Sequence, residues 1–409
     1  GWSSWSLEAT KYPGYGGGDH WADWLTAAHV EAQSDALHQT LQKHGYIYVN
    51  MDSGWMGGYD AYGRPSPDPK KFPGGIVAVA QHVHRNGQKL GIYWVPGIHE
   101  DLYKLNSPIL GTPYHVQDIV FKPKRPATGW GFGYRIDYSQ PGAQAYINSV
   151  AAQFATWGVD LLKFDGVTPG SGHNDLSMDA RPDVAAWGAA LKATRRPIWL
   201  ILSWNLDRDY RDYWQQYANS WRITDDVETY GPTLVGWDQV ARRFEAARAW
   251  GPNAGPGRGW NDLDSLDIGN GAMDGLTVDE RQTYMTLWAI ECAPLYTGDD
   301  LTKMDADGLR LLTNDEVLAV DQAGQIASPV VWGGAQVWRA KNADGSVVVA
   351  LFNLDGKSSA DVAATWKDLG LTGPAHVRDL WSHGSLGVFN DQYHATLAPH
   401  ACRLLKITP

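Results

Sequence analysis

DLLKFDG, at residues 160–166, ends a buried apolar run with two charged side chains. Alternation along a strand sends Lys163 and Asp165 to the same side. A short apolar run bounded by Asp and Gly is typical of a strand in a parallel sheet. A cation beside the carboxylate would keep it ionised and nucleophilic. The alternative is a buried ion pair without a chemical role.

Seven other short apolar runs share this pattern, and segments of helical periodicity separate them. The runs are GWSSWS (1–6), YIYVNMD (46–52), KLGIYWV (89–95), IWLILSW (198–204), SWRITDD (220–226), GRGWNDLD (257–264) and CAPLYTG (292–298). Helices are expected at 22–44, 143–157, 237–250 and 278–290. Eight strand–helix units predict an α/β fold, a closed (β/α)8 barrel.

The pattern changes after about residue 322 to strands and turns without a long helix. AQVWRA, SVVVALFN, HVRDLW and ACRLLKI are the strand-like stretches, and NADG is a turn. They predict a small antiparallel β-sandwich. We therefore expect two domains, a catalytic barrel at 1–322 and a sandwich at 323–409, since one core seldom serves more than about 300 residues.

Composition excludes several classes of function. A net charge of −11 and a pI near 5.6 disfavour nucleic-acid binding. No apolar run approaches the ~20 residues that span a membrane. No leader is visible, but the chain begins abruptly at a strand, so we expect a secreted or periplasmic protein. Cys292 and Cys402 are expected to be buried thiols.

The chain holds 21 Trp and 19 Tyr. Aromatic rings stack on the apolar faces of sugars, so this composition suits a carbohydrate-binding cleft, although most of the rings could equally be core residues.

Reacting groups of such barrels lie at the carboxyl ends of the strands. Polar residues end most of the runs here: Asp52, Tyr93, Lys163, Asp165, Ser203, Asn205, Arg222, Asp226 and Asp264. One such residue could merely cap the next helix. Polar endings on most strands instead indicate an active site.

SWRITDDV, at 220–227, supplies a second carboxylate. Arg222 and Asp226 are four positions apart and share a side of the strand, whereas Asp225 points away and is expected to be a helix cap or surface group. Two carboxylates converging on one cleft are what glycoside hydrolysis requires. A separation of about 5–5.5 Å would give retention of configuration and a wider one inversion.

Seven motifs together resemble the α-galactosidase and α-N-acetylgalactosaminidase family, glycoside hydrolase family twenty-seven. They occur in the family's order and span nearly the whole chain: GWSSW, NMDSGW, FPGGI with LGIY, LLKFDG, SWRITDDV, GWNDLDSLDIGNG and APLYTGDD. The resemblance implies Asp165 as the nucleophile and Asp226 as the acid/base. It implies sugar contacts from Trp5, Asp52, Tyr93, Lys163, Arg222 and Asp264, without a cofactor or a metal.

Two departures from the family pattern concern the substrate. Galactose-specific members usually have a second Asp where this chain has Ser53, and the acidic pair reads O4 and O6, so Ser53 weakens the case for an axial O4. Near Ser203, Asn205 stands in the region where the family uses a Glu on O2. Asn205 could still bind a 2-hydroxyl, whereas N-acetylgalactosamine is disfavoured. The family's Cys partners are replaced by Gly54 and Val167.

The expected function is a retaining, exo-acting α-glycoside hydrolase of the α-galactosidase type. Its substrate would be an oligo- or polysaccharide with a terminal α-linked sugar. An isomalto-dextranase-type activity on α-1,6-glucan is the alternative, and the aromatic segment GWGFGYRIDY (129–138) could supply further sugar contacts. A sugar-binding protein on an inactive scaffold and a metal-dependent barrel enzyme are the other classes considered. The histidines lack a paired ligand pattern for the latter.

Overall fold

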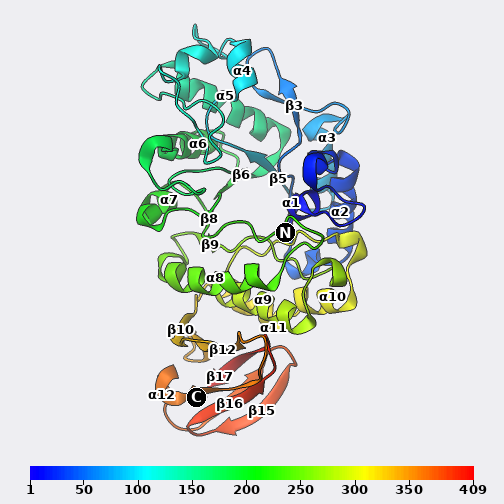
Figure 1. Ribbon diagram of the computed structural model, residues 1–409, viewed down its shortest axis with the longest axis vertical. Coiled ribbons are helices and arrows are strands. Elements are labelled where there is room, and N and C mark those ends of the chain that lie inside the picture. The colour runs from blue at the N-terminus through cyan, green and yellow to red at the C-terminus, as the bar shows by residue number, and fades with distance from the viewer. The chain divides into compact units, whose positions relative to one another are not determined.

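The computed structural model describes residues 1–409, which separate into two compact units, Gly1–Asp226 and Val227–Pro409 (Figure 1). The predicted domain boundary near residue 322 falls inside the second unit and stays a prediction. No helix in either unit combines the length and the apolar character needed to cross a membrane.

The first unit is built on six parallel strands that pair in chain order. They are β1 (Trp2–Ser3), β2 (Tyr48–Asn50), β5 (Lys89–Trp94), β6 (Val159–Phe164), β7 (Trp199–Leu202) and β8 (Ser220–Arg222). The register places Tyr93 of β5 beside Lys163 of β6. Since all six run the same way, their carboxyl ends meet at one edge of the sheet.

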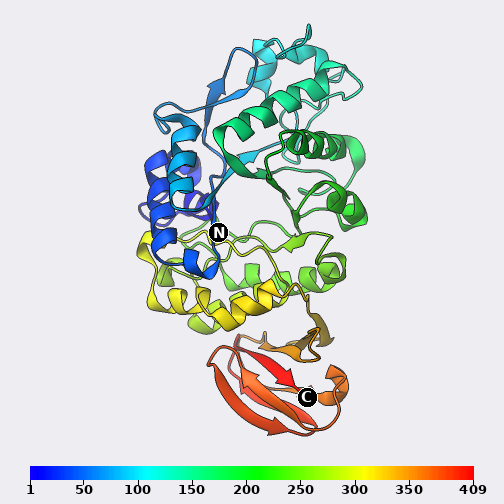
Figure 2. The ribbon, with the colours of Figure 1, turned by 180° about the vertical axis from the view of Figure 1, so that it is seen from behind.

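Helices cover the outside of this curved sheet, as Figures 1 and 2 show. They are α1 (Trp5–Ala9), α2 (Ala27–Gln39), α3 (Gly75–Arg85), α4 (Glu100–Leu105), α5 (Gly142–Trp157), α6 (Arg181–Ala193) and α7 (Arg211–Tyr217), with a hairpin of β3 (Met56–Tyr59) and β4 (Pro65–Pro67). In α5, Ile147, Val150 and Phe154 are buried at a spacing of three and four. Gly158 ends α5 with φ 90°, and β6 starts at the next residue.

The second unit begins with a helical part. They are α8 (Trp237–Trp250), α9 (Val278–Ile290), α10 (Ala306–Leu312) and α11 (Asp315–Gln322), with strand β9 (Trp260–Asp262). The bounds of α8 and α9 confirm the helices predicted at 237–250 and 278–290. Cys292 and Cys402 are buried and form no disulfide, as expected.

The strand predicted at 292–298 is wrong. Residues 292–298 form no regular strand, whereas the other seven runs each contain one. Pro294 lacks an N–H, which breaks the ladder of hydrogen bonds that a strand needs. The carbonyl of Tyr296 still accepts the N–H of Leu266 at 2.8 Å, so the segment keeps an extended contact without ladder pairing.

The rest of the second unit is antiparallel, as predicted. A six-stranded sheet has the order β10-β11-β12-β17-β14-β15, and β13 pairs with β16. The strands are β10 (Ser328–Val331), β11 (Ala335–Lys341), β12 (Val347–Asn353), β13 (Ala360–Thr365), β14 (Ala375–Asp379), β15 (Gly384–Phe389), β16 (Gln392–Leu397) and β17 (Cys402–Thr408), with the one-turn helix α12 (Trp366–Leu369). Alternate residues such as Val347, Val349 and Leu351 form the sandwich core with Val362 and Leu397.

Candidate active site

Lys163 and Asp52 form a buried ion pair at the carboxyl edge of the first unit's sheet. Nζ of Lys163 lies 2.7 Å from Oδ2 of Asp52, and the two side chains are 13% and 2% exposed. Nζ also lies 5.7 Å from the centre of the Tyr93 ring, as the strand register dictates. Burial lowers the pKa of Lys163, but the surrounding carboxylates raise it more, so the ammonium stays charged. The hydrogen-bonded partner of Lys163 is therefore Asp52 and not Asp165.

Asp165 follows β6 and is buried. Its N–H donates to the carbonyl of Trp94 at 2.9 Å, which extends the strand pairing by one residue. Oδ1 of its carboxylate is buried without a hydrogen-bond partner. An acceptor atom left open in this way costs stability, so it is a candidate for contact with a ligand.

Burial and the neighbouring charges shift the pKa of Asp165 in opposite directions. Burial raises the pKa of Asp165, and the charge of Lys163 lowers it. Asp226 and Asp52 add to the increase because each is a negative charge nearby. Burial also raises the pKa of Tyr93 well above its usual range, and the charge of Asp165 raises it further. Tyr93 therefore stays neutral beside the carboxylates.

Arg222 and Asp226 form a second ion pair, with Nη2 of Arg222 3.0 Å from Oδ1 of Asp226. Arg222 is fully buried, whereas 27% of the Asp226 side chain is exposed. The same Nη2 donates to the carbonyl of Asp225 at 2.8 Å, which holds the turn after β8. Arg222 and Asp226 are in contact as expected, but across a bend and not along a strand, because β8 ends at Arg222.

Ser4 and Glu8 join this cluster, and sequence reasoning missed both. Oγ of Ser4 donates to Oε1 of Glu8 at 2.5 Å and accepts the N–H of Asp52 at 2.9 Å. Glu8 is fully buried, and burial raises its pKa well above the usual range, with Asp52 adding to the increase. The sequence held one signal for a buried Glu8: in GWSSWSLE this Glu follows a run of apolar and small residues.

The other predicted residues of the first unit are placed as follows. Trp5 begins α1 and meets Trp21 edge-on at 5.6 Å between ring centres. Ser53 follows Asp52 and donates its N–H to Oδ1 of that residue at 2.8 Å. Ser203 is buried after β7 and lowers the pKa of Asp165.

Asn205 is an exposed residue that makes no side-chain contact with the cluster. Its backbone has φ 43° and its side chain is exposed, and only its N–H is bonded, to the carbonyl of Thr224 at 2.9 Å. The sequence could not show this left-handed backbone conformation, which is uncommon for a residue other than glycine.

Asp264 lies in the second unit. Oδ2 accepts the N–H of Val227 at 2.7 Å, and Oδ1 accepts the hydroxyl of Tyr296 at 3.2 Å. Asp264 has φ 84°, a conformation that these bonds hold in place.

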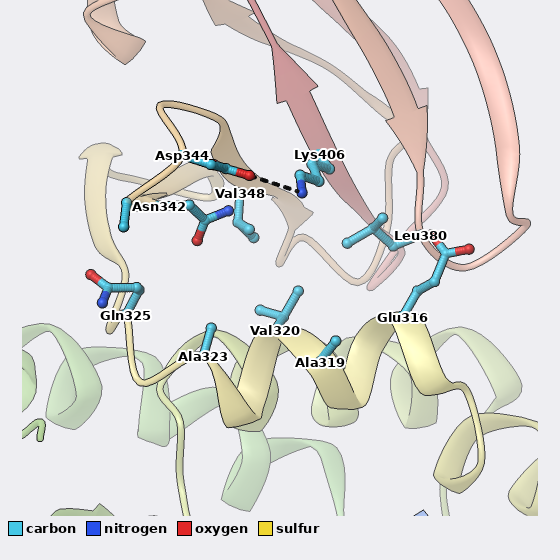
Figure 3. Close-up of a pocket in the computed structure, with 11 residues that line it drawn as sticks. Glu316, Ala319, Val320, Ala323, Gln325, Asn342, Asp344, Val348, Leu380 and Lys406 are labelled. Carbon is cyan, nitrogen blue, oxygen red and sulfur yellow. Dashed lines mark ion pairs between the residues drawn. The ribbon is translucent and has the colours of Figure 1, made fainter.

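The second unit contains a cavity that is separate from the predicted site residues. It has a volume of about 490 Å³ and lies between α11 and the sandwich. Figure 3 shows Ala319, Val320 and Ala323 of α11 facing Val348 and Leu380, with the Asp344–Lys406 ion pair at the rim. None of the predicted site residues lines it.

The cluster of the first unit thus presents two carboxylates in unlike surroundings. Asp165 is buried with an open oxygen, and Asp226 is partly exposed beside a guanidinium. Such a pair can attack an anomeric carbon on one side and protonate a departing oxygen on the other. The neutral and charged donors around them suit the hydroxyls of a sugar ring.

Two family models match the chain. "Alpha galactosidase A" matches residues 28–101 and 131–323, and "Alpha galactosidase C-terminal beta sandwich domain" matches residues 333–407. An α-galactosidase of Cyamopsis tetragonoloba is 30% identical over 100% of this chain and 85% of its own. The α-N-acetylgalactosaminidase of Mus musculus is 33% identical over 68% of this chain and 57% of its own.

Solved structures agree over the full length. The crystal structure of a β-L-arabinopyranosidase of family twenty-seven from Geobacillus stearothermophilus has a TM-score of 0.88 and 30% identity, covering 100% of this chain and 95% of that chain. The α-galactosidase I of Mortierella vinacea has a TM-score of 0.76 and 26% identity, over 100% and 96% of the two chains. The predicted fold class was a (β/α)8 barrel followed by a small antiparallel sandwich, and it is confirmed as a barrel-like parallel sheet with helices followed by such a sandwich.

Proposed function

The chain belongs to the α-galactosidase family, glycoside hydrolase family twenty-seven, and from its active-site residues we propose that it removes a terminal sugar with retention of configuration. It is an α-galactosidase-like glycoside hydrolase, and its substrate is a glycoside. The bond to be cut is a terminal linkage with the anomeric geometry of an α-galactoside, at the end of an oligo- or polysaccharide.

In this proposal Asp165 is the nucleophile and Asp226 the acid/base. Asp165 attacks the anomeric carbon while Asp226 protonates the departing oxygen, and Asp226 then activates the water that releases the sugar from Asp165. The open Oδ1 of Asp165 is the observation that carries the assignment. Asp226, more exposed than Asp165, has the access to solvent that an acid/base needs for exchanging protons.

The polar side chains around the pair would hold the sugar. Lys163, Asp52 and Arg222 offer charged hydrogen bonds to hydroxyls, and Trp5 and Tyr93 offer ring faces and edges. Asp264, Ser53 and Ser203 complete the proposed set. Asn205 stays a proposed contact to O2, from an exposed position.

Asparagine variants test the two roles. Asp165→Asn should abolish turnover of every substrate, because the amide is not a nucleophile. Asp226→Asn should retain activity on nitrophenyl glycosides, whose leaving groups hardly need a proton, and lose it on alkyl and sugar glycosides. Initial rates on both kinds of substrate measure this. Equal, mild losses from the two changes would contradict the assignment.

The stereochemical course is tested separately. NMR of the first product formed should show the anomer of the substrate's own configuration. The opposite anomer as first product would replace double displacement by inversion.

A second candidate is hydrolysis of β-L-arabinopyranosides, which have the shape of an α-galactoside without the O6 arm. Ser53 favours it through O6: this residue stands where galactose-specific members have an Asp that reads O4 and O6, and an arabinopyranoside keeps the axial O4 but has no O6 to bind. The Geobacillus β-L-arabinopyranosidase also matches the whole chain. Loss of a charged acceptor matters most for the hydroxyl that it would have bound.

A substrate panel decides between these sugars. It contains the nitrophenyl α-galactoside, α-glucoside, α-N-acetylgalactosaminide and β-L-arabinopyranoside, together with dextran for the isomalto-dextranase-type alternative. Ser53→Asp should raise the ratio of galactoside to arabinopyranoside kcat/KM by about tenfold. An unchanged ratio would remove Ser53 from the specificity argument.

The site of action belongs to the same proposal. Secretion, or export to the periplasm, would bring the enzyme to polymeric substrates. Activity confined to the cytoplasmic fraction of producing cells would contradict it.

A further inference from the structure

Trp130 and Phe132 form an exposed aromatic pair in the first unit. Their rings are stacked, with 5.4 Å between centres and 6° between planes, and the residues are 43% and 48% exposed. Exposing two large rings side by side costs free energy that a ligand would recover. We call these two residues the aromatic platform.

The backbone of the platform is held in place. Gly131 and Gly133 have φ values of 78° and 75°, which residues with a side chain rarely adopt, and this conformation turns Trp130 and Phe132 toward each other. The N–H of Gly131 donates to the carbonyl of Thr128 at 2.9 Å, and the hydroxyl of Thr128 donates to the carbonyl of Phe132 at 3.1 Å. The platform is therefore a preformed surface.

The platform lies against the residue that follows the proposed nucleophile. A methyl group on Gly166 would come within 2.4 Å of the Trp130 ring, so the ring rests on this glycine. The N–H of Gly129 also donates to the carbonyl of Gly166 at 3.0 Å. Because neighbouring Cα atoms are about 3.8 Å apart, the Trp130 ring reaches to within about 8 Å of the Asp165 Cα.

Phe132 is tied to the same edge of the sheet by other rings. His99 meets Phe132 edge-on at 6.3 Å and stacks on Trp94, the last residue of β5, at 5.5 Å. Burial lowers the pKa of His99, so this contact is between neutral rings. Both platform residues are thus anchored at strand ends that border Asp165.

We propose that the aromatic platform binds the leaving-group sugar, the residue released when the glycosidic bond breaks. The inference rests on the proposed function and specifies its second sugar site. Flat exposed rings suit the apolar face of a pyranose. The charged groups around Asp165 suit the hydroxyls of the sugar that is attacked, whereas the platform carries no charge and is exposed, as a departing group requires. Trp130 is also the last residue of segment 102–130, which the family model does not match, so this ring belongs to a part of the chain that differs from the family pattern.

Sugar transfer provides the test. In a retaining enzyme the sugar bound to Asp165 reacts either with water or with an acceptor sugar held in the leaving-group site. The acceptor's hydroxyl oxygen attacks the anomeric carbon, the bond to Asp165 breaks and leaves a carboxylate, and Asp226 takes the hydroxyl proton. The measurement is the ratio of transfer product to free sugar, with the fastest nitrophenyl glycoside as donor and glucose as acceptor.

Trp130→Ala should lower this ratio about three- to tenfold at a fixed glucose concentration, as expected for loss of one stacking ring. Phe132→Ala should lower it less, and Trp130→Phe should restore most of it. The ratio does not depend on the first step, so an effect on nitrophenol release cannot imitate the result. Trp332→Ala is the matched control, because Trp332 is also 43% exposed but lies in the second unit.

The outcomes separate the two proposals. Inversion in the NMR assay overturns the proposed mechanism. Retention without any transfer, or a transfer ratio equal in wild type and Trp130→Ala, overturns the platform as a leaving-group site. A fall of equal size in Trp332→Ala would do the same. A lower ratio in Trp130→Ala that Trp130→Phe restores supports it.

Discussion

Lys163 acts on two carboxylates, and it affects each of them in a different way. It forms the ion pair of Asp52 at 2.7 Å and lowers the pKa of Asp165 through its charge. Burial alone would favour the protonated form of Asp165, which cannot attack a carbon. Lys163, although it is ion-paired with Asp52, therefore helps to keep the carboxylate of the proposed nucleophile ionised.

Replacing Lys163 should change the pH dependence of the reaction. In Lys163→Met the influence that lowers the Asp165 pKa is lost, so this pKa rises and the acidic limb of the pH–rate profile moves to higher pH. Asp52 stays in place in this variant, and its charge adds to the increase. We also expect a decrease of about 100-fold in kcat/KM at the optimum, because a charged contact to the sugar disappears.

The pH profile of nitrophenol release measures this change. Lys192→Met, at an exposed position on α6, is the control and should leave the profile in place. An acidic limb that stays put or moves down in Lys163→Met would contradict the electrostatic account.

At the scale of elements, α9 shows how local signals and tertiary contacts combine. Thr277 and Glu280 form a capping box: Oγ1 of Thr277 accepts the N–H of Glu280 at 3.3 Å, and Oε2 of Glu280 accepts the N–H of Thr277 at 2.8 Å. Oε1 of Glu280 lies 2.6 Å from Nδ1 of His400 in the sandwich part of the unit. One Glu thus serves both the helix start and a contact distant in sequence.

Thr277→Ala should destabilise the protein by about 1 kcal/mol, the usual worth of an N-cap. Urea unfolding of the two proteins measures the difference. Thr372→Ala, at an exposed loop position, should change stability by less than about 0.5 kcal/mol. Equal effects of the two substitutions would show that the cap contributes nothing.

Local signals also explain which elements were predicted well. The bounds of α8 and α9 agree with the sequence because apolar periodicity and helix ends are properties of neighbouring residues. The strand predicted at 292–298 was wrong because the prediction rested on the apolar composition of this run, whereas Pro294 prevents regular strand pairing. The aromatic platform was visible as a segment rich in rings, but neither the stacking of Trp130 on Phe132 nor its contact with Gly166 can be read from spacing.

Across the whole molecule, several buried acids affect stability in the same direction. Burial raises the pKa of Glu291 and Asp321 well above their usual range, and that of Asp183 to about 7. A group whose pKa is higher in the folded state stabilises the fold fully only at low pH. Its contribution is lost as the pH rises from about 4 through the folded pKa.

Glu291→Gln isolates this effect, because both carboxyl oxygens of Glu291 are buried without a hydrogen-bond partner. We expect the loss of unfolding free energy between about pH 5 and about pH 8 to shrink by at least about 1.4 kcal/mol in the variant. Urea unfolding at the two pH values measures it. Glu245→Gln, on an exposed side chain, should keep the wild-type difference. A variant with the full wild-type loss would contradict the raised pKa.

The sequence by itself determined the order of most strands and helices and the sandwich, since alternation and helical periodicity are local. The family motifs in the sequence also predict the positions proposed to carry the chemistry. Only the tertiary structure decided which of these residues meet. Lys163 forms its ion pair with Asp52, 111 residues away in the chain, and not with the neighbouring Asp165. Glu8 is a buried part of the same cluster. Asn205 stayed exposed, with a left-handed backbone. The physical reason is that such contacts join residues far apart in the chain, whose distances are set by the packing of the whole sheet.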